Sequence, residues 1–178
     1  FDGLQKWLIG NQLIAAGITA GGDALSLQLL DAAIDQTYAA THIAMSKAMR
    51  RRLTQASRNS SVGGILATTQ DVFGRQVTTY NGLPILEIDV DNTGTSVLGF
   101  SEANPGGGSA VGTSIYVLSL GLDTLCGLQN GLPRTKDLGE QQSKPAYRTR
   151  VEWYSGLVVR HPRAATRLWG IKDAAVVA

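Results

Sequence analysis

The stretch from Tyr147 to His161 constrains the fold more than any other part of the sequence. Apolar and polar side chains alternate along it, and no proline interrupts the alternation before Pro162. A period of two residues is typical of a strand with one buried face. One face carries Val151, Trp153, Leu157 and Val159, and the other carries Arg148, Arg150, Glu152, Tyr154 and Arg160. The pattern therefore predicts one long strand.

A strand of this length is difficult to fit inside a compact molecule. It would span about 50 Å at about 3.3 Å per residue. A compact chain of 178 residues has a radius of gyration near 16 Å, so its diameter is only about 40 Å. Either the strand bends, with Gly156 as the favoured place, or the molecule is elongated. We prefer an elongated molecule, and elongated subunits are often building blocks of assemblies.

Composition narrows the classes of function. The chain is 43% hydrophobic and 17% charged, which is typical of a folded protein with a weakly charged surface that favours contact with other proteins. The net charge of +2 is far below that of a dedicated nucleic-acid binder. The single Cys126 excludes an internal disulfide and fits a reducing compartment. No apolar run approaches the ~20 residues of a membrane span, so no membrane partner is expected. Residue 1 is Phe, which indicates a processed, truncated or partly represented chain.

The first third of the chain predicts two helices and a strand. Residues 1–20 are expected to form a connector that packs against the rest. Asp23 as N-cap, with an apolar stripe that ends at Tyr38, predicts a helix over Ala24–Thr37. A short strand is expected over Thr41–Met45. Ser46 then caps a second helix, whose buried stripe comprises Met49, Leu53 and Ala56.

A hairpin is the clearest local signal in the middle of the chain. Asn81-Gly82 separates two strand-like runs, Gln76–Tyr80 and Leu83–Val90, and favours a type I′ turn because both central residues need positive φ. The remaining expectations are a mobile loop over Asn92–Gly112, a buried strand over Ser114–Leu120, an exposed loop over Leu132–Lys144 and a last strand over Ala165–Ile171.

Two patterns imitate ligand-binding loops. Gly106 to Ser114 is rich in glycine, but no Lys precedes its Ser or Thr as a phosphate loop requires. Asp89, Asp91 and Gly94 imitate the start of a calcium loop, but the twelfth position is Phe100 instead of Glu. A flexible loop and a polar strand end are favoured, so no cofactor is expected.

Cys126 and two histidines are the remaining candidates for chemistry. Cys126 lies in the apolar sequence Leu-Cys-Gly, where a buried thiol is usually inert. His42 and His161 are far apart in the sequence and are poor evidence for a metal site. We therefore predict no catalytic residue and no metal ligand.

Two groups of arginines could contact anions. Arg50, Arg51 and Arg52 fan across about 200° of a helix and favour a solvated or subunit-contacting face. The arginines of the long strand, beside Glu152, would meet either nucleic acid or the carboxylates of a neighbouring subunit. The small net charge favours the subunit.

Four stretches taken together suggest a family. Asp23–Thr37 looks like a spine helix, and Thr41–Leu53 is similar to the strand and helix that enter an axial domain. Phe73–Ile85 is similar to a Gly-x-Pro-Ile/Val hairpin, and Tyr147–Ala165 looks like a long strand that returns beside the spine helix. In their order and spacing, over residues 20–172, they resemble the major capsid (coat) protein of tailed bacteriophages. Encapsulin shells and herpesvirus capsid floors share that fold.

The resemblance implies a mixed α+β fold with two domains. A peripheral domain would comprise residues 1–40, with the spine helix, and 145–162, with the long strand. An axial domain would comprise residues 41–144 and 163–178, with a central mixed sheet flanked by helices. The N-terminal arm and extended loop of such coat proteins are expected to be absent, because only about 22 residues precede the helix.

The resemblance also implies a structural function and no enzymatic activity. The chain would self-assemble into pentamers and hexamers of an icosahedral shell that encloses packaged double-stranded DNA, in a virion assembled in the host cytoplasm. Its partners would be copies of itself, scaffolding and portal proteins, and non-specific DNA on the inner face. Apolar residues such as Trp7 or Trp169 would be exposed in an isolated subunit. The alternatives are an encapsulin-like nanocompartment, a decoration or tail protein, and an enzyme with a pocket that the sequence does not reveal.

Overall fold

The computed structural model describes residues 3–19, 21–58, 66–70, 74, 76–105 and 111–177. The helices are α1 (Leu4–Trp7), the 3-10 helix η1 (Gly10–Gln12), α2 (Leu27–Gln36) and α3 (Lys47–Ser57). The strands of the body are β1 (Leu13–Ala15), β2 (His42–Ser46), β3 (Leu66–Gln70), β4 (Gln76–Tyr80), β5 (Leu83–Ile88), β6 (Glu102–Ala103), β7 (Val111–Leu118) and β12 (Ala165–Ile171). A separate ribbon comprises β8 (Leu125–Gln129), β9 (Arg134–Glu140), β10 (Tyr147–Glu152) and β11 (Ser155–Val159).

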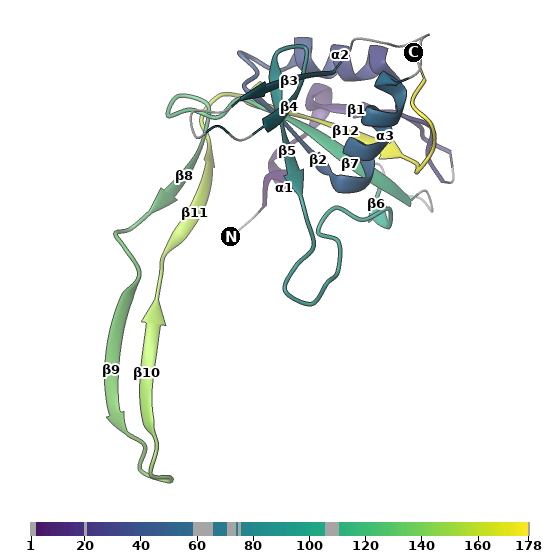
Figure 1. Ribbon diagram of the computed structural model, residues 1–178. Coiled ribbons are helices and arrows are strands. Elements are labelled where there is room, and N and C mark those ends of the chain that lie inside the picture. Colours follow the sequence, from purple (N-terminus) through teal and green to yellow (C-terminus); the bar gives the residue numbers. More distant parts are fainter. Residues whose placement is uncertain are drawn as a thin grey trace.

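The body is built on one mixed sheet, with the strand order β1-β12-β7-β2-β5-β4-β3 and β6 beside β7. β12 pairs in parallel with β1 and antiparallel with β7, and β2 pairs in parallel with β5. The ribbon projects far out of this body, so the molecule is elongated as predicted (Figure 1). The mixed α+β class is likewise the one expected from the sequence.

Alternate residues of the central strands supply two apolar clusters, one on each face of the sheet. Ile43 and Met45 of β2 belong to the larger cluster, together with Leu30 of α2 and Leu53 of α3. Ala44, between them in sequence, belongs to the second cluster. Successive side chains of a strand point to opposite faces, so α2 and α3 cover one face. The second cluster also receives Leu8, Tyr116 and Leu125, with Leu157 and Val159 packed against it.

Several local predictions are confirmed. β12 has the predicted bounds, and Ser46 caps α3 by accepting a hydrogen bond from the backbone N–H of Met49 at 3.4 Å. Asn81 and Gly82 have φ of 49° and 78°, as a type I′ hairpin requires. The predicted cap Asp23 is wrong, because α2 starts after Ser26. The backbone of Asp23 bonds instead with Gly170 and Lys172 beside β12.

Glycines allow the N-terminal connector to cross β12 at very short range. The register of β12 shifts between Leu168 and Ile171, and Gly170 there has a φ of 72°. A Cβ at Gly170 would lie 2.4 Å from the carbonyl oxygen of Gly17, and one at Gly22 would lie 2.2 Å from that of Gly170. No side chain fits at such distances, so glycine is required at this crossing.

Two predictions about the ribbon are wrong. Residues 132–144 are not a loop, because β9 occupies most of them and pairs with β10. The stretch from Tyr147 to His161 is not one strand, because Trp153 and Tyr154 separate β10 from β11. The loop expected over Asn92–Gly112 is wrong in part, because β6 and the first residues of β7 lie within it, and its residues 106–110 lie outside the described residues. The division into peripheral and axial domains stays a prediction.

Candidate assembly surface

The ribbon is a pair of antiparallel two-stranded segments joined end to end. β8 pairs with β11 next to the body, and β9 pairs with β10 further out. Between the segments, the N–H of Asn130 donates to the carbonyl of Tyr154 at 3.0 Å, so the pairing continues. The outer segment extends away from the sheet (Figure 1). An isolated two-stranded ribbon is marginally stable in water, so this part needs a further surface to pack against.

A clamp at its root ties the ribbon to the body. The guanidinium of Arg163 donates to the carbonyls of Asp35 and Gln36 at 2.9 and 2.8 Å, at the C-terminal end of α2. A cation is favourable there because the helix dipole is negative at this end. The ring of His161 stacks on Tyr38 with 4.6 Å between centroids. These contacts connect the end of β11 to the end of α2.

An apolar stripe runs along the ribbon from its root into solvent. At the root, Leu157 and Val159 are partly buried against the second apolar cluster, as the alternation predicts. Further out, Val151 is 68% exposed and Trp153 is 58% exposed. The predicted burial of these two side chains is therefore wrong within this chain. The alternation of apolar and polar side chains therefore continues along the ribbon beyond the residues that the body covers.

Other large apolar side chains of the ribbon are also exposed. Exposed fractions reach 75% for Leu132 and 79% for Tyr147. The same holds for Leu128, Leu138 and Tyr154. Exposed apolar groups gathered on one projecting element mark an interaction surface, whereas single ones are ordinary.

The opposite face of the outer segment is basic. Arg150 lies across from Lys136, and Glu152 lies across from Arg134, so these side chains share one face. Arg148 is two residues before Arg150 on the same strand and lies on that face too. Arg150 forms an ion pair with Glu152. In the outer segment, Val151 thus lies on the face opposite these cations, together with Tyr147, Thr149 and Asp137.

The candidates for nucleophile or metal chemistry lie in separate places. Cys126 is on β8, with its Sγ 4.0 Å from the carbonyl oxygen of Leu122. His42 Nδ1 lies 3.0 Å from Thr41 Oγ1, and His161 stacks on Tyr38 at the ribbon root. Within the described ranges, no three His, Cys, Asp or Glu side chains are grouped so as to hold a metal ion.

Asp89 and Asp91, which match the start of a calcium-loop pattern, bind other groups of the same chain. Asp91 Oδ1 accepts hydrogen bonds from Thr93 and Thr95, which hold the pKa of this carboxyl below its ordinary value. Asp89 pairs with Lys47, which lowers its pKa as well. Two arginines of α3 also form ion pairs within the chain. Arg50 Nε lies 3.0 Å from Glu87 Oε1, and Arg52 Nε lies 2.7 Å from Asp173 Oδ1.

The sequence patterns did not predict a buried polar cluster around Arg167. Arg167 of β12 is only 3% exposed, and its guanidinium lies 3.0 Å from Ser114 Oγ and 3.3 Å from a carboxylate oxygen of Glu102. The hydroxyl of Tyr116 also donates to Glu102, and burial raises the pKa of this phenol to about 12. The cluster fastens β6 to β7 and β12. A charged residue in the apolar run of β12 was the signal that could have revealed it.

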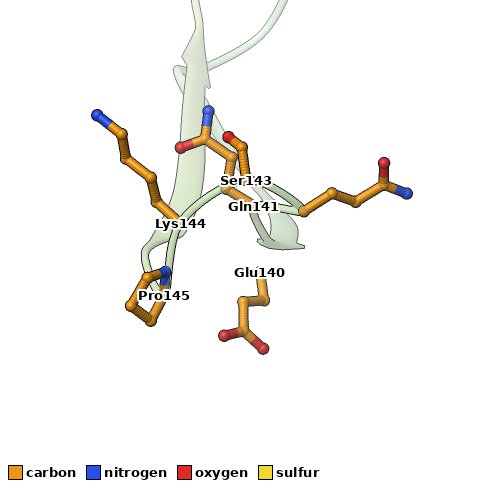
Figure 2. A pocket seen from close by; sticks show the side chains of 6 residues that line it. Glu140, Gln141, Ser143, Lys144 and Pro145 are labelled. Atoms are coloured by element: carbon orange, nitrogen blue, oxygen red, sulfur yellow. The ribbon is translucent and has the colours of Figure 1, made fainter.

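Two open hollows lie along the ribbon. One lies at the tip of the ribbon, where Figure 2 shows the side chains of Glu140, Gln141, Ser143 and Lys144 splayed in different directions. Its floor is a turn in which the N–H of Gln141 donates to the carbonyl of Ala146 at 2.9 Å. A second hollow lies at the middle of the ribbon beside Trp153 and Tyr154. Among the helices that the structure describes, none has the length and apolar character to cross a membrane.

Comparison with known proteins supports the fold alone. No protein-family model and no curated protein matches the sequence. The chain is similar to the subunit in a cryo-EM structure of the holo-SrpI encapsulin complex from Synechococcus elongatus PCC 7942, with a TM-score of 0.71 and 17% identity. The match covers 99% of this chain and 59% of that one. The chain therefore has the capsid fold that encapsulins share, and the predicted fold class is confirmed. The narrower resemblance to tailed-phage coat proteins stays a prediction.

Proposed function

We propose that this chain is a structural subunit of a closed protein shell built from many copies of itself. The observation that carries the proposal is the ribbon. It projects from a well-packed body and exposes apolar side chains, such as Val151 and Trp153, on a segment too thin to bury them itself. In a shell, neighbouring copies would cover this stripe. The capsid fold of the chain supports the same proposal.

The finer proposal is the major capsid protein of a tailed bacteriophage. Its copies would form pentamers and hexamers of an icosahedral shell around double-stranded DNA, with scaffolding and portal proteins as further partners and the virion as location. This follows from the resemblance of the four stretches described above. No enzymatic role is proposed, and the hollow at the ribbon tip is open, with the side chains of Glu140 and Lys144 pointing apart (Figure 2).

An encapsulin-like nanocompartment is the second candidate, and the similarity to an encapsulin subunit favours it. The two shells have the same architecture and differ in what they enclose. A phage capsid encloses DNA, whereas the alternative encloses protein. A decoration or tail protein is a weaker third candidate, because the capsid fold of this chain would then have no role in its function.

Electron microscopy of the gene product that contains this chain tests the proposal. We expect closed shells of uniform diameter in the purified material. Nuclease-protected DNA inside them would favour the phage capsid, and a co-purifying protein identified by mass spectrometry would favour the nanocompartment. Particles that stay monomeric at every protein concentration and ionic strength, with the flanking coding sequence included, would overturn the shell proposal.

A further inference from the structure

We propose that the basic face of the outer ribbon, comprising Arg134, Lys136, Arg148 and Arg150, binds the sugar–phosphate backbone of double-stranded DNA. The inference rests on the proposed function, in which neighbouring copies cover the face of the ribbon that carries Val151. A two-stranded ribbon is a single layer, so its other face then points away from those copies. The basic face is therefore free to meet a different partner.

The geometry of the face suits a polyanion. Cations two residues apart on a strand are separated by about 6.6 Å, and cross-strand partners are closer still. Double-stranded DNA presents one charge per ~1.7 Å of axis, so several phosphates lie within reach of a face this long. Three of the four cations are arginines, whose planar guanidinium binds phosphate oxygens in pairs. Glu152 is the one acidic side chain of this face in the outer segment, and it pairs with Arg150.

The carboxylates of a second copy are the competing partner, and four of those on the body are already engaged. Three exposed acids of the body are already neutralised by cations of α3. Lys47 pairs with Asp89, Arg50 pairs with Glu87, and Arg52 pairs with Asp173. Asp91 is engaged in its own turn. These four carboxylates are thus engaged within their own chain, whereas Arg134, Lys136 and Arg148 have no ion-pair partner among the described residues.

The test is fluorescence anisotropy of a labelled 30-base-pair DNA duplex titrated with the chain at increasing KCl concentration. Four phosphate contacts predict a slope of about −3.6 in log K against log salt, so binding weakens by roughly 150-fold between 50 and 200 mM. The variant Lys136→Gln/Arg148→Gln should halve that slope and weaken binding at 50 mM KCl. Both side chains are exposed, so the variant should keep the circular dichroism spectrum of the parent chain.

A matched control separates this face from net charge. Arg51→Gln/Arg58→Gln removes two equally exposed cations from α3 and its C-cap, with the same change of charge. It should leave the slope unchanged. Equal losses in both variants, or no binding by the parent chain at 20 mM KCl, would overturn the proposal. A ribbon variant that binds DNA normally but assembles poorly would instead assign the face to carboxylates of another copy. The assay needs no shell, so the DNA proposal can fail while shells still form.

Discussion

The exposed stripe of the ribbon makes a quantitative prediction about assembly. Trp153 is 58% exposed. A tryptophan side chain buries up to about 250 Å², so about 145 Å² remains for a neighbour to cover. At about 25 cal/mol per Å², and allowing for the methyl group that alanine retains, Trp153→Ala should cost about 3 kcal/mol per contact. That energy corresponds to a roughly 100-fold weaker contact.

Static light scattering against protein concentration measures this effect. The concentration at which shells appear should rise by about two orders of magnitude in Trp153→Ala. Thr149→Ala is the matched control, because Thr149 is an exposed polar residue on the same strand face as Val151. It should leave that concentration unchanged.

Thermal unfolding of the unassembled chain is the second measurement. Most of the Trp153 side chain contacts nothing in the free chain, so the free energy of unfolding should fall by much less than 3 kcal/mol. A large drop in melting temperature with an unchanged assembly concentration would refute the reasoning. It would mean that Trp153 stabilises the ribbon of its own chain instead of a contact between copies.

Two further predictions concern the body. Gly170→Ala should lower the free energy of unfolding by about 3 kcal/mol or more, because it adds a positive-φ penalty of about 1–2 kcal/mol to a clash with the carbonyl of Gly17. Thermal melts measure this loss. Gly139 also has a positive φ, 76°, but has open space around it, so Gly139→Ala should show the φ penalty alone. Folding raises the pKa of Tyr116 from an ordinary 10 to about 12, so the unfolded chain loses this proton at a lower pH than the folded chain. The free energy of unfolding should therefore fall between pH 10 and 12, by up to about 1.4 kcal/mol per pH unit. Denaturant titrations should detect the fall, and Tyr116→Phe should reduce its slope; an identical slope in that variant would assign the loss to other groups.

Local chemistry explains which parts of the fold the sequence predicts. Asn81-Gly82 favours one turn type because of backbone φ alone, and Ser46 caps a helix through an atom three residues away. The limits of β12 follow from an apolar run that is buried on both faces. Each of these signals is contained within a few residues, so no knowledge of the tertiary structure is needed.

The missed features depend on distant contacts. β9 carries no apolar alternation because both faces of the outer ribbon are exposed, and its pairing with β10 is set by the turn at residues 141–146. Arg167 is buried only because Ser114 and Glu102 come from other strands. The sequence predicted the apolar residues of the candidate surface but not their exposure. The alternation around Val151 indicated a face to be buried, but not that the chain leaves it uncovered.

The position of β12 has a consequence for synthesis of the chain. This strand lies between β1 and β7 and pairs Leu13 with Arg167 across most of the sequence. The central sheet therefore cannot close on a ribosome until Ile171 has emerged from the exit tunnel. Contacts between such distant residues form slowly, because the loop-closure entropy must be lost before the contacts are gained. Nascent chains thus stay incompletely folded until β12 has been synthesised, which delays until then any association between copies that needs the closed sheet.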